Sequence, residues 1–348
     1  MKIALIGPTP PPQGGIATHI YRLERRLAAD GHNVAVYGNC SSLKWILAAF
    51  GRWWRFDIAH FHDIDWGKCV LVGLFGILGI PAMLTIHGDS LTSQVANSSK
   101  VKNRIYGFFL KKIRHIFCVK EAIVKDLVAI GVNPAHISVL NAFLPPASEE
   151  IETTRISPEQ RQFMEMHNKN IVLNASRIMP VSETEDLYGI SLSIELCRRL
   201  SESYPGLGFC CNLAVPVDES RFEFLQTQIR DMGMSEVYRF FVGKPFVPVL
   251  AQADLLLRPT YEDGYAVSVA EAMFLGIPVV ASDMVPRGEG VELFRTGNIE
   301  NLEAKVRFVL EHYEEYKERR IRRNFWESYE GLLAEYSLLV ARKAGKTS

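Results

Sequence analysis

The chain has 348 residues, of which 48% are hydrophobic and 22% charged, and its 39 basic side chains balance 39 acidic ones. This composition is typical of a globular protein and the length suits two domains. Nucleic-acid-binding proteins usually have an excess of basic residues, which this chain lacks, so its zero net charge argues against nucleic acid as a partner. The six cysteines form no CxxC pair and lie mostly in apolar segments, so we expect buried, reduced thiols of a cytoplasmic protein.

The first half of the chain alternates between predicted strands and helices. A helix with Ile16, Ile20, Leu23 and Leu27 at helical spacing follows the first strand and ends at Gly31. Short apolar strands are predicted at 2–7, 33–38, 57–62, 81–87 and 115–120. The apolar run 69–84 contains glycines and Pro81, so we expect a buried helix and strand there and not a membrane span.

A polar, proline-containing stretch at 144–170 separates this half from a second alternating half. Strands are predicted at 170–177, 208–215, 237–243, 254–260 and 277–282, with helices at 192–200 and 222–230 and a helical segment from 301 to the end. Continuous apolar strands of this kind belong to parallel sheets covered on both faces. The predicted fold is α/β, with doubly wound domains at 1–150 and 151–324 and a final helix, 325–348, packed back on the first.

The segment "PTYEDGYAVSVAEAMFLGIPVVAS", residues 259–282, places two acidic residues at a strand-to-helix turn. The carboxyl edge of a parallel sheet is where ligands bind, and a helix start favours anions. Taken alone, Asp263 could be an ordinary loop acid. Glu271 could instead complete a capping box with Ser268. Both alternatives stay open from the residues alone.

This segment resembles the signature of retaining glycosyltransferase family 4, of the GT-B fold, in its capsule and lipopolysaccharide-type bacterial members. Asp263 and Glu271 match the two acids of that signature. The family usually has Glu at the first position, so neighbouring Glu262 is an alternative carboxylate. The resemblance implies two Rossmann-like domains that face a central cleft, an acceptor-side one first and a donor-binding one second.

Other motifs extend the resemblance along the chain. "GGIATHI" resembles the family's glycine-rich loop and is no GxGxxG fingerprint. Tyr188 stands where the family has a lysine for the donor diphosphate; Lys244 is a possible replacement, and Arg287 in "PRGEG" a weaker donor contact. By resemblance, the catalytic residues are His87, Arg177 and Asp263. The donor-binding residues are Gly15, Lys244, Glu262, Gly264, Tyr265, Ala266, Val267 and Glu271, with Gly14 on the acceptor side.

No metal or cofactor is expected. His60 and His62 alternate with apolar residues and could mimic a metal pair, but no third ligand has suitable spacing nearby, which favours a structural role. The Asp-x-Asp form of "DID" at 63–65 is interpreted as a loop.

The resemblance implies transfer of a sugar from a nucleotide sugar, with UDP as the commonest base, to a glycan or lipid-linked acceptor of cell-surface polysaccharide. A sugar-nucleotide 2-epimerase of the same architecture, a degenerate transferase that only binds the donor, and a sugar-binding protein of periplasmic type are the alternatives. The basic, aromatic stretches 44–56 and 103–115 suggest peripheral contact with the anionic inner face of the cytoplasmic membrane, or else ordinary helices with a solvated basic side.

Overall fold

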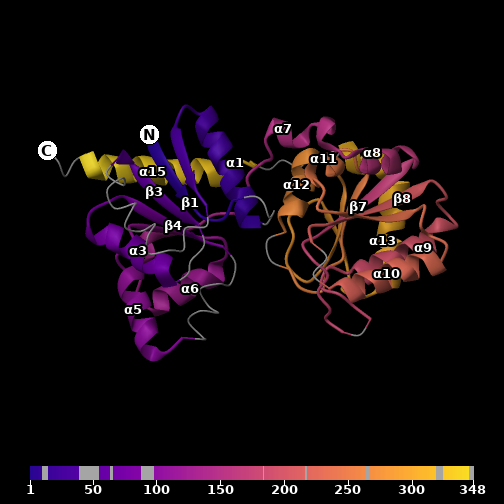
Figure 1. The fold of residues 1–348 in the computed structure, drawn as a ribbon, viewed down its shortest axis with the longest axis horizontal. Coiled ribbons are helices and arrows are strands. Elements are labelled where there is room, and N and C mark those ends of the chain that lie inside the picture. The colour runs from indigo at the N-terminus through magenta and orange to yellow at the C-terminus, as the bar shows by residue number, and fades with distance from the viewer. Residues whose placement is uncertain are drawn as a thin grey trace. The chain divides into compact units, whose positions relative to one another are not determined.

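The computed structural model describes residues 1–9, 15–38, 55–62, 66–87, 98–182, 184–215, 218–263, 266–318 and 324–344. The chain forms two compact units. The first unit contains Met1–Pro145 together with the segment from Asn324 onward, and the second unit contains the chain between them (Figure 1).

The first unit is built on a six-stranded parallel sheet in the order β2-β1-β3-β4-β5-β6. Its strands are β1 (Lys2–Ile6), β2 (Asn33–Tyr37), β3 (Ile58–His62), β4 (Ala82–Ile86), β5 (His115–Cys118) and β6 (Ile137–Val139). Its helices are α1 (Gly15–Ala29), α3 (Trp66–Ile77), α5 (Lys100–Leu110), α6 (Glu121–Ala129) and α15 (Glu327–Ala344), with a 3-10 turn at Pro134–His136.

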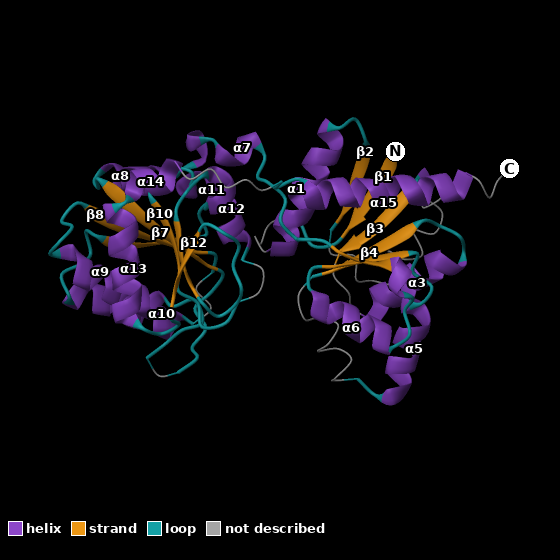
Figure 2. Ribbon diagram, turned by 180° about the vertical axis from the view of Figure 1, so that it is seen from behind, coloured by secondary structure: helices purple, strands orange, loops and turns teal. Residues whose placement is uncertain are grey.

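Strand alternation divides the core of this unit into two layers. In β1, Ile3 and Leu5 pack with α1 and α15, whereas Ala4 and Ile6 face the layer made by α3, α5 and α6. Figure 2 shows α15 lying across the strands on one face of the sheet and α3, α5 and α6 on the other. The last helix thus completes the core of the unit in which the chain begins.

The second unit contains another six-stranded parallel sheet, in the order β12-β11-β10-β7-β8-β9. Its strands are β7 (Lys169–Ala175), β8 (Leu207–Leu213), β9 (Tyr238–Val242), β10 (Leu255–Arg258), β11 (Val279–Ser282) and β12 (Val291–Phe294). Its helices are α7 (Ser148–Ile151), α8 (Pro158–Glu165), α9 (Ile190–Ser201), α10 (Glu219–Asp231), α11 (Val247–Leu250), α12 (Val267–Leu275), α13 (Ile299–Glu311) and α14 (Tyr313–Glu318), with a 3-10 turn at Thr153–Arg155.

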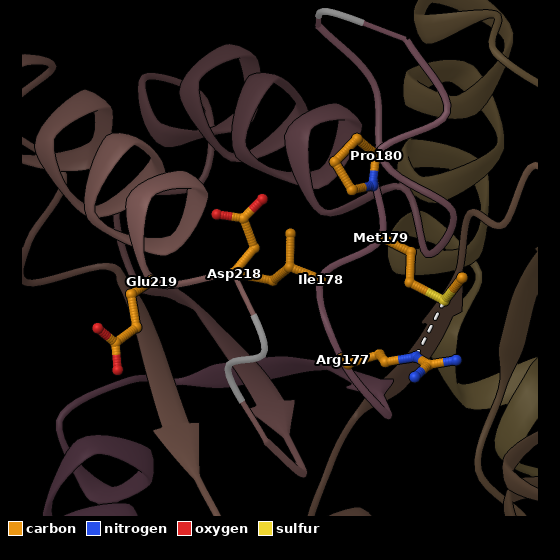
Figure 3. Close-up of a pocket in the computed structure, with 6 residues that line it drawn as sticks. All are labelled: Arg177, Ile178, Met179, Pro180, Asp218 and Glu219. Carbon is orange, nitrogen blue, oxygen red and sulfur yellow. Dashed lines mark hydrogen bonds between the residues drawn. The ribbon is translucent and has the colours of Figure 1, made fainter.

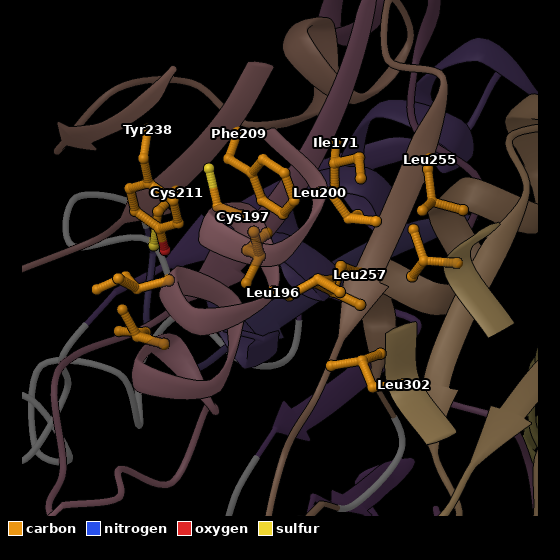
Figure 4. Packing of buried hydrophobic residues seen from close by; sticks show 14 of the residues in the cluster. Ile171, Leu196, Cys197, Leu200, Phe209, Cys211, Tyr238, Leu255, Leu257 and Leu302 are labelled. Atoms are coloured by element: carbon orange, nitrogen blue, oxygen red, sulfur yellow. The ribbon is translucent and has the colours of Figure 1, made fainter. Parts of the chain in front are cut away.

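Buried side chains of this sheet interlock with the helices on one of its faces. Ile171, Phe209 and Leu255 from the strands meet Leu200 of α9 and Leu302 of α13 in one continuous cluster (Figure 4). Helices α8, α11 and α12 cover the opposite face. Both sheets are therefore enclosed on two sides, which explains why their strands read as continuous apolar runs.

The predicted α/β fold with two Rossmann-like sheets is confirmed. The run 69–84 divides into α3 and β4 as expected, and no helix of the described residues has the length and hydropathy needed to cross a bilayer. The short edge strands β6 and β12 were not predicted, and the stretch 144–170 contains α7 and α8. The five cysteines in the described residues are buried thiols, and burial raises the pKa of Cys118 and Cys197 to about 12.

Strand order places one topological switch point in each sheet. In the first sheet the chain leaves β1 toward β2 and then returns to the other side of β1 at β3. In the second sheet the same reversal occurs between β7 and β10. Because helices on the two sides of a switch point diverge, open α/β sheets bind their ligands at the carboxyl ends of these strands.

Four histidines are gathered near the switch point of the first sheet. His60 is fully buried, and its ring nitrogens lie 2.6 Å from the Tyr336 hydroxyl of α15 and 2.7 Å from Thr85 Oγ1. Nδ1 of His19 lies 2.8 Å from the Ala142 carbonyl oxygen, so this nitrogen carries the proton and donates it. Burial lowers the pKa of His19 from its ordinary value of 6.5 to about 4 and holds the pKa values of His60, His62 and His87 well below that value.

We expect these neutral imidazoles to make the first unit acid-sensitive. The unfolded chain binds protons below pH 6.5 while folded His19 resists them down to about pH 4, so the free energy of unfolding falls as the pH drops through this window and is constant above it. At 1.36 kcal/mol per pKa unit, His19 alone contributes about 2 kcal/mol of the loss between pH 7 and pH 5. Urea denaturation at pH 7 and at pH 5 measures this loss of unfolding free energy.

His19→Gln should flatten this pH dependence, whereas His136→Gln, outside the histidine cluster, should keep the wild-type dependence. An equal loss of stability in wild type and His19→Gln would contradict the role of burial.

Gly189 joins two segments of the second unit that meet at its switch point. Its φ is 67°, it precedes α9, and a Cβ there would lie 2.0 Å from the carbonyl oxygen of Pro259, just after β10. Gly233 has nearly the same φ, 69°, but a Cβ there would meet no atom of the described part of the chain within 4 Å. Comparing substitutions at these two glycines therefore distinguishes the cost of backbone strain from the cost of a steric clash.

We therefore expect Gly189→Ala to destabilise the protein more than Gly233→Ala. Both alanines carry the left-handed backbone cost, about 1 kcal/mol, and only Gly189→Ala adds overpacking worth roughly 1–3 kcal/mol. Chemical denaturation of the two variants measures the difference, and equal losses would show that the Pro259 segment moves away without cost.

Candidate functional site

The switch point of the second sheet lies between two polar strand ends. β7 ends at Ala175 and is followed by Ser176 and Arg177, and β10 ends at Arg258 and is followed by Pro259. The two strands are hydrogen-bonded neighbours. The residues predicted from the signature segment therefore lie at the ligand-binding edge of this sheet.

Helix α12 begins at this edge. Its N-cap is Ala266, which is buried, and no side chain of the described residues caps its first turn. Val267 is half-buried, and Gly264 and Tyr265 lie outside the described residues. A helix start without a side-chain acceptor presents backbone amides that suit an anionic group.

Glu271 occupies the interior of α12 and not its cap. Because the helix begins at Val267, Ser268 is the second helical residue and Glu271 the fifth, so the capping-box alternative is wrong. The Glu271 residue is only 4% exposed in an otherwise apolar helix. Acidic side chains are rarely this buried, and this one belongs to the helix that begins at the ligand-binding edge of the sheet, where a carboxylate can meet a ligand.

Asp263 is held by two arginines. Arg258 donates Nε and Nη2 to its two carboxylate oxygens at 3.0 and 2.9 Å, and Arg287 donates Nη2 at 2.7 Å. Burial alone would raise the pKa of Asp263, but the two guanidiniums more than offset it and lower that pKa. Neighbouring Glu262 is exposed, so the two acids of the loop have different environments.

The loop that contains Tyr188 is organised by a carboxylate that no sequence pattern singled out. Asp186 is fully buried, and its oxygens accept the amides of Tyr188, Ile190 and Ser191 at 3.1, 3.0 and 2.9 Å. These bonds hold Tyr188 with its hydroxyl 2.6 Å from Ser176 Oγ. The ring of Tyr188 is therefore fixed beside the ends of β7 and β10.

The two other predicted cations of this unit, Arg177 and Lys244, have contacts with residues other than Asp263. Arg177 is exposed, its Nε lies 3.1 Å from Met179 Sδ, and it lines a depression of about 690 Å³ with Pro180, Asp218 and others (Figure 3). Lys244 follows β9, three strands from β10 or roughly 14 Å at ordinary strand spacing. Its Nζ lies 3.6 Å from Glu159 in an exposed ion pair.

In the first unit, the fold brings His87 to a group that sequence spacing did not reveal. His87 Nε2 lies 3.3 Å from His62 Nδ1, and ring nitrogens of His19, His62 and His87 all lie within 4.8 Å of one another. The argument that no third ligand approaches was therefore wrong for His62, although His60 is structural as expected. This group of neutral imidazoles has a geometry that could hold a metal ion.

The glycine-rich loop is described only from Gly15, the first residue of α1. Gly15 is exposed, and a Cβ there would meet no atom of the described residues within 4 Å. Gly14 lies outside the described residues, as do Asp63 and Asp65.

Three residues of these sites were not identified from sequence: Arg258, Asp186 and His19. Arg258 lies near the end of the strand predicted at 254–260, next to the signature segment, and a charge in that apolar strand was the available signal. Asp186 and His19 had no comparable signal, because their partners are set by tertiary contacts.

Two family models match the chain, one in each half. Residues 37–144 match the model described as Glycosyltransferase Family 4, and residues 218–312 match the model described as Glycosyl transferases group 1. The first lies within the first unit and the second covers α10 to α13 of the second unit.

Known proteins with similar sequences include an N-acetylglucosaminyltransferase subunit and a glycogen synthase. One subunit of human phosphatidylinositol N-acetylglucosaminyltransferase is 23% identical over 313 residues, covering 78% of this chain and 60% of its own length. A glycogen synthase of Mycobacterium tuberculosis is 22% identical over 376 residues, covering 89% of this chain and 86% of its own.

Among solved structures, the crystal structure of HepE from Anabaena in complex with UDP superposes with a TM-score of 0.63 at 16% identity, covering 100% of this chain and 99% of HepE. That likeness concerns the fold. Combined with the two family models and the named relatives, it identifies this chain as a glycosyltransferase of the GT-B fold.

Proposed function

We propose that this glycosyltransferase moves a sugar from a nucleotide sugar, most simply a UDP-sugar, to a glycan or lipid-linked saccharide of a cell-surface polysaccharide, with retention at the anomeric carbon. The observation that carries the proposal is a buried carboxylate, Glu271, in a helix whose first turn has no side-chain cap, at the switch point of the second sheet. HepE, whose fold matches this chain over its whole length, was crystallised in complex with UDP.

The proposed reaction breaks the bond between the anomeric carbon and the leaving phosphate oxygen and forms one to an acceptor oxygen. The acceptor proton passes to the leaving phosphate. In this proposal Glu271 accepts hydrogen bonds from the ribose hydroxyls, His87 and the loop around Glu262 and Gly264 contact the sugar, and Arg177 stabilises the developing diphosphate charge. No metal or cofactor takes part in the proposed reaction.

Product analysis separates this proposal from its alternatives. A transferase releases UDP only when an acceptor, supplied as a membrane lipid extract, is present, and the NMR coupling constant of the new linkage reports retention. A 2-epimerase would change the sugar without an acceptor, and a degenerate transferase would bind nucleotide without turnover. The fold does not choose among these.

We expect Glu271→Gln to weaken UDP binding without unfolding the second unit, because glutamine keeps the shape of the side chain and removes the charge that accepts the ribose hydroxyls. A hydrogen bond to a charged group is worth about 1.5–3 kcal/mol, so the loss should be roughly tenfold to a hundredfold. Isothermal titration calorimetry measures it, with the exposed Glu236→Gln as control.

Unchanged UDP affinity in Glu271→Gln would contradict this role. An early thermal transition with normal affinity would assign Glu271 to the stability of α12.

We also propose that the first unit rests on the anionic, cytoplasmic face of a membrane. Helices α3 and α5 pack closely, since a Cβ at Gly73 would lie 2.8 Å from the Phe109 carbonyl oxygen. Exposed apolar side chains lie at the end of α3 and just after it, Ile77 and Leu78, and on α5, Val101 and Phe108. Exposed basic side chains surround α5, namely Lys102, Arg104, Lys111 and Lys112. Most of the other predicted membrane stretch, 44–54, lies outside the described residues.

This surface predicts binding to phosphatidylglycerol-containing vesicles and not to phosphatidylcholine vesicles. Neutralising Lys111 and Lys112 together should weaken binding roughly tenfold or more, at about 1 kcal/mol per basic side chain near an anionic surface. Phe108→Ser should weaken it as well, whereas Phe224→Ser, equally exposed on α10 of the second unit, should not. Vesicle co-sedimentation is the measurement, and a wild-type protein that ignores anionic vesicles would end this proposal.

A further inference from the structure

The ion cluster around Asp263 contains more positive than negative charge. Arg258 and Arg287 share the single carboxylate of Asp263, and neither guanidinium has an ion pair with another carboxylate of the described residues. The side chains of Arg258, Asp263 and Arg287 are 12%, 5% and 5% exposed. A partly desolvated excess cation is unfavourable unless a further anion joins it.

Not every donor of the two guanidiniums is occupied. Arg258 uses Nη1 for the Asn174 carbonyl oxygen at 3.0 Å, in addition to its two bonds to Asp263. Arg287 Nε is buried and has no hydrogen-bond partner among the described residues. A buried guanidinium nitrogen without an acceptor is a rare arrangement that calls for a ligand or water. The cluster therefore has both the charge and a donor for an additional anion.

The position of Arg258 explains the tyrosine at 188. The centre of the Arg258 guanidinium lies 5.2 Å from the centroid of the Tyr188 ring, a distance at which cation and ring attract each other. Tyr188 is itself held by Ser176 and by the Asp186 bonds to its loop. The aromatic ring of Tyr188 thus stabilises the positive charge of Arg258, which comes from β10. A lysine at position 188 would instead place its own positive charge there.

We propose that Arg258 and Arg287 form the binding site for the outer phosphate of a nucleoside diphosphate group, with Asp263 as the counter-charge that positions both guanidiniums. This inference rests on the proposed function and adds two arginines to Arg177 as cations for the diphosphate. Asp263, expected by resemblance to be catalytic, then acts through the arginines and not on the sugar. The fork geometry of arginine suits a phosphate, and the first turn of α12 follows the same loop.

The test compares ligands that differ by one phosphate. UDP, UMP and uridine are titrated into wild type, Arg258→Gln and Arg287→Gln by calorimetry, with Arg239→Gln on β9 as control. We expect each of the first two variants to reduce the preference for UDP over UMP at least fivefold and to leave uridine affinity unchanged. Arg239→Gln should keep the wild-type preference.

A second variant separates phosphate binding from stability. In Arg258→Gln, adding Tyr188→Lys returns a cation to the same place and should restore part of the UDP preference. If the glutamine variants do not fold, Arg258→Lys keeps a charge without the bidentate fork, and a reduced UDP preference in that variant supports the site.

Failure of this inference is distinguishable from failure of the proposed function. If the wild-type protein binds no nucleotide, both the proposed function and this inference are wrong. The inference would be wrong if Arg258→Gln and Arg287→Gln discriminated UDP from UMP as well as the wild type does, or if Arg258→Lys did so when only that variant folds. That result would show that the cluster is a structural ion pair only, and the proposal of nucleotide binding would still hold.

Discussion

Parallel pairing of every strand in the two sheets is the constraint on which the rest of the structure depends. Parallel strands require crossover helices, and these helices enclose each sheet and send all carboxyl strand ends to one edge. Polar residues such as His62 and Arg258 are the last residues of their strands and so lie at these edges. Both candidate sites therefore follow from topology before any particular side chain is considered.

Buried ionisable groups are neutral in the first candidate site and charged in the second. In the first, burial lowers the pKa values of the histidines and leaves neutral rings such as His60, which can then bond to Thr85 and Tyr336 without a buried charge. In the second, Asp263 stays charged because two arginines face it. A neutral cluster suits contact with sugar hydroxyls, whereas a charged cluster suits a phosphate.

Local contacts anchor the loops of the second site to one another. Asp186 bonds three amides at the start of α9, and Gly189 allows the Pro259 carbonyl to pass within contact distance. These contacts fix the loops after β7 and β10 relative to each other, and with them Tyr188 and Arg258. A site assembled from two loops thereby gains the precision of the sheet that supports it.

The sequence by itself determined the α/β class, the sites of most strands and the importance of the segment 259–282, because apolar periodicity and strand-to-helix turns are local properties. It did not reveal the short strands β6 and β12, whose few apolar residues carry little periodic signal. Tertiary structure alone decided that Glu271 lies inside its helix, that Asp263 faces Arg258 and Arg287, and that His19 joins His62 and His87. Helix register, the path of the loop that returns Asp263 to Arg258, and contacts between residues distant in sequence decide these features, and residue spacing does not encode them.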